Sequence, residues 1–381
     1  MKIYRLLLLG LLSFVACTSS HKNVEGFFVT RLGVDTIAVE SYTENANSIQ
    51  GTSVLCAPRT TVRHYSMTFN DEGLPESFSF STGPVDAGSQ MTRNYRYTDD
   101  SVQIVTSENG ITKTNSARIA GRPFPFFANV IGVWDYAIRH TLKNNGTKEF
   151  STMAGNRALR YLIQGNAPGR LELSNPEQDF GPLYATLDSA DVLDKFDLTP
   201  TTDKFVAERA GSLNVEALAK EFAAREKSGN SLSALSPRDT VRADIGGATI
   251  LIDYGRPAMR GRTIFGNVVP WNVVWRLGAN AATQLITNKT LAFGRTIVLP
   301  GTYSLFALPS EEGWKLIINY QRGQWGTIHD ESKDLARLPL NTRHLSESTE
   351  QFTFNIAAHG RNGVLSFKWE NTEASIPFTV R

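Results

Sequence analysis

The sequence predicts a mainly β protein: an N-terminal antiparallel β-meander with one or two packed helices, followed by a C-terminal β-sandwich or jelly-roll-like domain. Runs of β-branched and aromatic residues recur along most of the chain, and several alternate apolar and polar residues as half-buried strands do. Segments rich in Gly, Asn and Pro separate these runs, as turns between strands require. A helical spacing of three and four residues is convincing in two stretches only.

The first residues predict export from the cytoplasm. Lys2 and Arg5 precede an apolar core of about ten residues, residues 6–15, which is too short for the ~20 residues of a membrane-spanning helix. We therefore expect residues 1–16 to be a signal peptide that is removed. The stretch from Phe14 to Cys17 resembles a bacterial lipobox, although Phe14 stands where Leu is usual.

This resemblance predicts a lipid-anchored envelope protein. Cys17 would carry the lipid, residues 17–24 would form a tether, and the membrane would be a partner at the periplasmic side or the cell surface. Acyl chains hold such a protein because each buried methylene contributes ~0.8 kcal/mol. The alternative is an ordinary signal cut near Ala16 without a lipid.

Charge and cysteine content exclude several classes of protein. Removal of residues 1–16 takes away Lys2 and Arg5, which leaves 37 of the 39 basic residues against 37 acidic ones. A neutral chain lacks the basic excess of a general nucleic-acid-binding protein. If Cys17 is lipidated, Cys56 has no intrachain partner, so we expect Cys56 to be a small buried hydrophobic residue.

We expect the N-terminal domain to cover residues 25–230. Strand patterns dominate to about residue 120, and shorter strand patterns return after the first helix. That helix is predicted near residues 127–143 and the second near residues 214–227, where Asn214 or Ser212 can cap its start. The helical spacing comes from Phe127, Ile131, Trp134, Ile138 and Leu142 in the first helix, and from Val215, Leu218, Ala219 and Phe222 in the second.

Small and polar residues predict a linker at residues 231–236, and strand patterns predict a β-sandwich over residues 237–381. This region also carries an ordered string of short motifs: Asp253-Tyr254-Gly255-Arg256-Pro257, Gly261-Arg262-Thr263-Ile264-Phe265-Gly266, Trp275-Arg276-Leu277-Gly278-Ala279-Asn280, and Leu299-Pro300-Gly301-Thr302-Tyr303. With them, residues 236–381 resemble the domain-of-unknown-function family 2911 of exported bacterial proteins. The resemblance implies no activity, cofactor or catalytic residue, and it does not extend to the N-terminal domain.

The candidate binding site is the connection at residues 253–280, which concentrates arginine and tryptophan. Guanidinium groups bind carboxylates and phosphates through two parallel hydrogen bonds, and an indole ring offers a stacking wall. The residues that we predict to bind a small anionic or carbohydrate-like ligand are Arg256, Arg262, Trp275, Arg276 and Asn280. Arg260 is expected at the solvated tip of the loop. The alternative is structural: these arginines bond loop carbonyls, and Trp275 belongs to the core.

The sequence offers no catalytic residue and no metal site. Its six histidines are scattered, and none shows the spacing of a metal-binding motif. It has no nucleophile elbow, phosphate-binding loop or dinucleotide fingerprint, so we assign no cofactor.

Three functions remain open. The first is a non-enzymatic binding or scaffold module with the ligand site described above. The second is a hydrolase acting on an envelope or glycan substrate, which needs an acid or a histidine with a perturbed pKa in a concave pocket near Trp275. The third is lipid handling by the N-terminal domain, which needs an apolar cavity beside Trp134.

Overall fold

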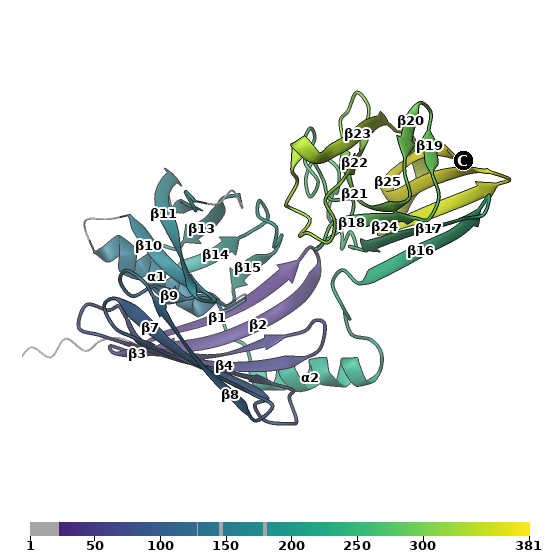
Figure 1. Cartoon of the computed structure of the whole chain (residues 1–381). Helices are drawn as coiled ribbons and strands as arrows, with labels where there is room; N and C mark the ends of the chain where they lie inside the picture. Colours follow the sequence, from purple (N-terminus) through teal and green to yellow (C-terminus); the bar gives the residue numbers. More distant parts are fainter. Residues whose placement is uncertain (1–22, 128, 145–147, 178–180) are drawn as a thin grey trace, which may run out of the picture.

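The computed structural model describes residues 23–127, 129–144, 148–177 and 181–381, and it shows the mainly β architecture that the sequence predicts (Figure 1). Cys17, the predicted lipidation site, and residues 1–16, the predicted signal peptide, lie outside the described residues. Strands β1 to β15 form one sheet, which runs from β8 through β7 and onward to β1, continues through β15, and ends at β9. Neighbouring strands of this sheet are antiparallel, except for the parallel pair β9 and β10.

The strands of the N-terminal sheet have the following bounds: β1 (Val24–Leu32), β2 (Asp35–Glu44), β3 (Ser48–Leu55), β4 (Thr61–Phe69), β5 (Pro75–Gly83), β6 (Met91–Tyr97), β7 (Ser101–Glu108), β8 (Ile111–Arg118), β9 (Phe124–Pro125), β10 (Glu149–Ala154), β11 (Arg157–Ala167), β12 (Arg170–Ser174), β13 (Leu183–Leu187), β14 (Leu193–Asp197) and β15 (Val206–Arg209).

Two helices cover opposite faces of this sheet. Helix α1 (Ile131–Lys143) lies on the face around which the sheet curves, and α2 (Val215–Lys227) lies on the outer face (Figure 1). The side of α2 that carries Val215 packs against Val39 and Val54. These strand residues adjoin Glu40 and Ser53 in the chain, which point to the other face, because successive side chains alternate.

Helix α1 begins four residues later than predicted. Asn129 has a positive φ of 62°, a conformation that a helix does not admit. Phe127, which the helical spacing had included, instead stacks on Phe80 with ring centroids 4.0 Å apart. Trp134 is only 5% exposed and meets the rings of four aromatic residues. These are Phe126, Phe150, Tyr161 and Phe196.

The C-terminal domain is built from two sheets that enclose a core of their own. One sheet has the order β16-β17-β18-β21-β22-β23, and the other has the order β20-β19-β25-β24. The bounds are β16 (Arg238–Ile245), β17 (Ala248–Gly255), β18 (Thr283–Thr287), β19 (Leu291–Phe293), β20 (Thr296–Val298), β21 (Gly301–Leu308), β22 (Lys315–Asn319), the 3-10 helix η1 (Glu331–Lys333), β23 (Asp334–Pro339), β24 (Asn341–His359) and β25 (Asn362–Val380).

The turn between β1 and β2 touches the loop after β17. The Val34 N–H donates to the Arg260 carbonyl oxygen at 3.0 Å, and the Arg260 guanidinium pairs with Asp35. Gly33 has a φ of 62°, and a Cβ there would lie 2.0 Å from the Arg260 oxygen. The sequence had suggested that Arg260 is solvated, and this prediction is wrong. The N-terminal domain supplies Asp35 as its partner.

The separate cores predict two separable unfolding transitions. We expect Trp134→Ala to lower the free energy of unfolding of the N-terminal domain, and Trp369→Ala to lower that of the C-terminal domain, each by about 3–5 kcal/mol, since both indoles are buried. Each substitution should shift only one of the two calorimetric transitions. Trp325→Ala is the control, because this indole is 51% exposed. If both core substitutions shifted a single transition equally, the two cores would not be independent.

Candidate functional site

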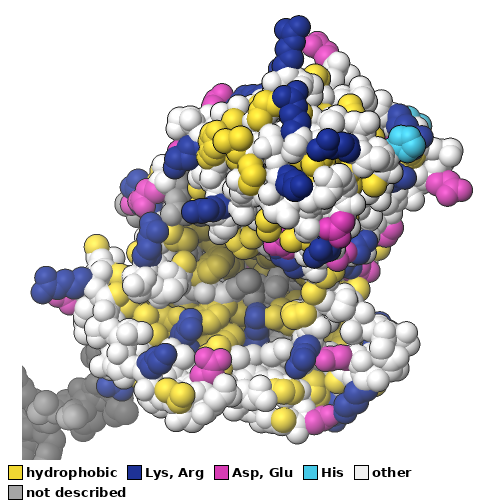
Figure 2. Space-filling view, turned by 45° about the vertical axis from the view of Figure 1, so that its right-hand side comes forward, with side chains coloured by type: hydrophobic (Ala, Val, Ile, Leu, Met, Phe, Trp, Pro, Cys, Tyr) yellow, Lys and Arg dark blue, Asp and Glu magenta, His cyan; other side chains and the backbone are white. Residues whose placement is uncertain are grey.

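The connection between β17 and β18, residues 256–282, lines a cavity where the two domains meet. The cavity has a volume of about 760 Å³, and its walls come from both domains. Figure 2 shows a hollow between the domains with hydrophobic side chains on its walls and Lys or Arg side chains close by. A cavity of this size lies within the range of small-molecule sites, roughly 300–1,000 Å³.

Four of the five predicted ligand-binding residues line this cavity, and Arg256 does not. Arg262, Trp275, Arg276 and Asn280 contribute to its wall. The Arg256 guanidinium turns elsewhere. It pairs with Asp239 at 3.0 Å and donates to the Thr353 hydroxyl at 3.1 Å and the Phe352 carbonyl at 3.3 Å. Arg256 thus joins strands of the C-terminal domain.

Arg262 fixes its own loop. Its Nε donates to the Met259 carbonyl at 2.9 Å, and its Nη2 donates to the Ala258 carbonyl at 2.8 Å. The structural alternative therefore describes these two donors well. The positive charge remains beside the cavity, and burial together with nearby Arg260 lowers the pKa of Arg262.

Of the four arginines in the connection between β17 and β18, Arg276 is the one whose side chain has no partner among the described residues. Among the described residues it makes no ion pair or hydrogen bond, and its Nη1 atom is buried without a partner. Burial lowers the pKa of this guanidinium. Gly326 passes close beneath it, and a Cβ at Gly326 would lie 2.2 Å from the Arg276 Cδ. Native structures rarely leave buried donors unbonded, so this group is a candidate for an external acceptor.

Lys204 is a cavity residue that the sequence did not reveal. It lies between β14 and β15, at a positive φ of 60°, and lines the cavity from the N-terminal domain. Burial lowers the pKa of Lys204, and the charges of Arg276 and Arg262 lower it further. Three cations thus approach one another across the junction, and none of them forms an ion pair within the described part of the chain.

Asp203 is the acidic residue among the described residues of the cavity wall. Its side chain reaches solvent at the cavity, yet the surrounding protein raises the pKa of its carboxyl through desolvation. Because no ion pair joins Asp203 to a described cation, its charge does not cancel those of Lys204, Arg262 and Arg276 through a direct contact.

Trp275 belongs mainly to the core, as the structural alternative predicted. It is 9% exposed and stacks on Trp369 with ring centroids 5.8 Å apart. Its indole N–H donates to the Gly278 carbonyl at 3.3 Å. The following loop is strained, since Leu277 and Asn280 have φ values of 47° and 64°. Such outliers persist where the surrounding structure holds them, often at functional sites.

No group of three or more His, Cys, Asp or Glu residues in the described ranges is arranged to hold a metal ion. Within the same ranges, no helix has both the length and the apolar character needed to cross a bilayer. Cys56, expected to be buried, is 5% exposed.

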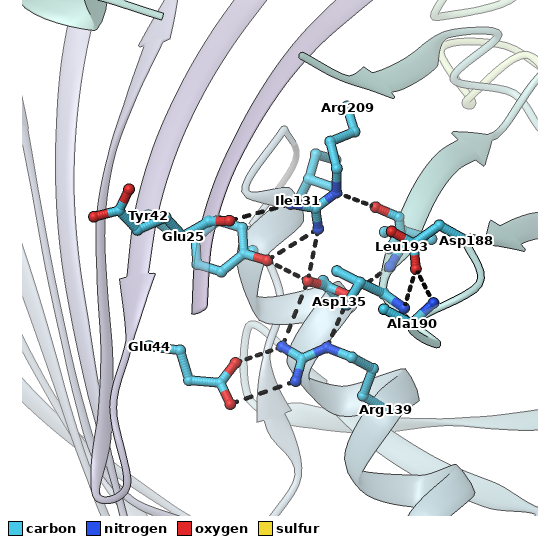
Figure 3. Close-up of polar contacts among 12 residues, drawn as sticks. Glu25, Tyr42, Glu44, Ile131, Asp135, Arg139, Asp188, Ala190, Leu193 and Arg209 are labelled. Atoms are coloured by element: carbon cyan, nitrogen blue, oxygen red, sulfur yellow. Dashed lines mark hydrogen bonds and ion pairs between the residues drawn. The ribbon is translucent and has the colours of Figure 1, made fainter. Parts of the chain in front are cut away.

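A second concentration of ionisable side chains lies inside the N-terminal domain, between β2 and α1 (Figure 3). Glu40, Tyr42 and Glu44 alternate along β2 and face the helix. Two strand residues advance about 6.7 Å and four helical residues advance about 6.0 Å, so successive partners on the two elements stay close over this length. We call these three residues and their helix partners the β2–α1 seam.

Asp135 is the centre of the β2–α1 seam, and it is fully buried. It accepts hydrogen bonds from the Tyr42 hydroxyl and the Leu193 N–H, and it pairs with Arg139 at 3.0 Å and Arg209 at 3.1 Å (Figure 3). Arg139 also pairs with Glu44. Each of these charges has a partner, so the cluster fixes α1 in the sheet and leaves no group for a ligand.

Glu40 caps the start of α1. Its carboxylate accepts the Ile131 N–H at 2.5 Å, the Gly132 N–H at 3.1 Å and the Tyr65 hydroxyl at 2.6 Å. A carboxylate is favourable at the positive end of a helix. Complete burial outweighs these contacts and raises the pKa of Glu40 to about 7.

Residues 236–378 match the model of a family described as protein of unknown function (DUF2911), which confirms the resemblance seen in the C-terminal motifs. The match stops before the N-terminal domain, so it covers the Arg262 and Arg276 side of the cavity and leaves out the Lys204 side. The comparison with curated proteins found no match to the chain.

The titration of Glu40 predicts a specific pH dependence of stability. The pKa of the Glu40 carboxyl is higher in the folded protein than in the unfolded chain. Its contribution to the free energy of unfolding is therefore fully present below the unfolded pKa of 4.5 and is lost as the pH rises through about 7. We expect the free energy of unfolding of the wild type to fall by about 2 kcal/mol relative to that of Glu40→Gln between pH 5 and pH 8, because the glutamine side chain cannot titrate.

Urea unfolding at the two pH values measures this difference. Glu76→Gln, an exposed substitution on β5, is the control and should follow the wild-type pH dependence. Parallel curves for Glu40→Gln and wild type would show that Glu40 does not titrate in this range.

Proposed function

We propose that this protein is a lipid-anchored binding protein of the bacterial cell envelope, and that the cavity between its domains holds a small anionic ligand. The observation that supports a ligand is the buried Nη1 atom of Arg276, which has no partner within the part of the chain that the structure describes. Lys204 and Arg262 add positive charge at the same place, with Lys204 coming from the other domain. An anion there would accept hydrogen bonds and lower the repulsion among the three cations.

Cys17 supports the location. It follows Phe14-Val15-Ala16 at the end of an apolar leader, which is the arrangement of a lipidated envelope protein. The chain after it starts β1 at Val24, so the tether is short.

A hydrolase is the second candidate, and Asp203 is the observation that favours it. Its pKa is raised by desolvation, and it lies in the same cavity as Trp275. A carboxyl with a raised pKa suits a general acid or base. The binding protein is favoured because the described wall provides an unpaired cation for an anion, whereas Asp203 has no bonded catalytic partner.

The anion site predicts a difference between two arginines. We expect inorganic phosphate and octanoate to change the tryptophan fluorescence of the full chain, and Arg276→Gln to weaken this binding at least tenfold, the scale of one charge-assisted hydrogen bond. Arg256→Gln is the matched control, because Arg256 lies outside the cavity wall, and it should bind as wild type does.

Equal effects of Arg276→Gln and Arg256→Gln would contradict an anion site in the cavity. Steady release of product from an ester probe, abolished by Asp203→Asn, would support the hydrolase instead.

The anchor predicts a change of fractionation. In the bacterial host, we expect wild-type protein to incorporate labelled palmitate and to sediment with membranes, because two or more acyl chains give lasting attachment. Cys17→Ser should lose the label and leave the membrane fraction, whereas Cys56→Ser should retain both. A membrane-bound Cys17→Ser protein would show that another feature holds it there.

A further inference from the structure

Most of the cavity wall is apolar, although Lys204, Arg262 and Arg276 form a charged corner where we propose that the anion binds. The exposed side chains of Pro58, Pro200, Ala234, Pro270 and Val273 meet at this cavity from four separate segments of the chain. Val273, for example, is 52% exposed. Apolar side chains scattered singly on a surface need no explanation, whereas a contiguous group around a hollow marks a binding surface.

The size of the cavity exceeds what a small inorganic anion needs. Phosphate or acetate would occupy only the corner formed by Lys204, Arg262 and Arg276, because the whole cavity measures about 760 Å³. The remaining wall would then face water. A ligand that also covers the aliphatic wall gains free energy in proportion to the apolar area it buries.

The wall suits an aliphatic chain better than a sugar or an aromatic ring. The two indoles at the cavity, Trp275 and Trp369, are 9% and 2% exposed, so their faces are occupied by the core. The accessible apolar side chains of the wall are those of Pro, Val, Ala and Leu residues, which offer no flat face for stacking. The carbohydrate-like ligand considered from the sequence is therefore less favoured than an alkyl chain.

We infer that the ligand is a single-chain anionic amphiphile, whose carboxylate or phosphate headgroup lies at Lys204 and Arg276 and whose alkyl chain lies along Val273 and the prolines. This inference rests on the proposed anion site and adds the chemistry of the rest of the ligand. It places amphiphile binding at the junction of the domains, away from Trp134 in the N-terminal core.

A chain-length series tests the inference with the full chain. Acetate, butyrate, hexanoate, octanoate and decanoate are titrated at constant ionic strength, below the concentrations at which they form micelles. We expect the dissociation constant to fall roughly fourfold per added methylene beyond butyrate until the chain fills the cavity. Decyl phosphate and decanoate together distinguish a phosphate from a carboxylate headgroup.

Two variants locate the alkyl chain. Val273→Asn should weaken decanoate binding at least fivefold and leave acetate binding unchanged, because only the longer ligand reaches this wall. Val364→Asn is the matched control, since Val364 is 39% exposed on β25 and is not part of the cavity wall. It should change neither ligand.

The outcomes separate this inference from the proposed function. Equal affinities for acetate and decanoate, both lost in Arg276→Gln, would overturn the amphiphile and leave the anion site intact. Decanol binding as tightly as decanoate and unaffected by Arg276→Gln would overturn both, and so would an absence of binding across the whole series.

Discussion

The mutual repulsion of Lys204, Arg262 and Arg276 is the constraint on which the junction between the domains depends. Burial lowers the pKa of each group, and the arginines lower that of Lys204 further. Repulsion among these three cations opposes close approach of the two domains, so other contacts between the domains must offset its unfavourable free energy. The Arg260–Asp35 pair and the Val34 hydrogen bond hold the same junction together. Ionisable groups whose pKa values are shifted by burial and by neighbouring charges, and which lie in a cavity, are typical of binding sites.

The β2–α1 seam shows how this chain treats buried charges that serve the fold. Asp135, Arg139 and Glu44 are at least as deeply buried as the cavity cations, yet each has an oppositely charged partner at bonding distance. Removing one member of such a pair is costly, because the other charge is left buried. Arg276 has no oppositely charged partner among the described residues, which sets this cavity residue apart from the paired charges of the β2–α1 seam.

Local patterns in the sequence predicted the architecture well. The period of two identified the strands, and the spacing around Trp134 and Val215 identified both helices. The start of α1 was wrong by four residues because its cap, Glu40, comes from a strand about ninety positions earlier in the chain. A long-range cap leaves no local signal for a helix start.

For the same reason, the sequence predicted the C-terminal side of the candidate site and missed the side that the N-terminal domain supplies. Arg262 and Arg276 lie in one loop whose unusual composition singled it out, but Arg256 in that loop turns toward Asp239. Lys204 belongs to an unremarkable turn of the N-terminal sheet, and only the contact between the domains brings it to the cavity. Arg260, which looked solvated, finds Asp35 through that same contact.

The most direct measurement is the titration of the Lys204 ammonium group by NMR, in the free protein and with decanoate bound. A cation that is partly buried and also faces two arginines should have a pKa below the ordinary value for lysine, and that pKa should rise when the anion occupies the cavity. An ordinary pKa that decanoate leaves unchanged would contradict the account, because Lys204 would then share no cavity with Arg276 and the ligand.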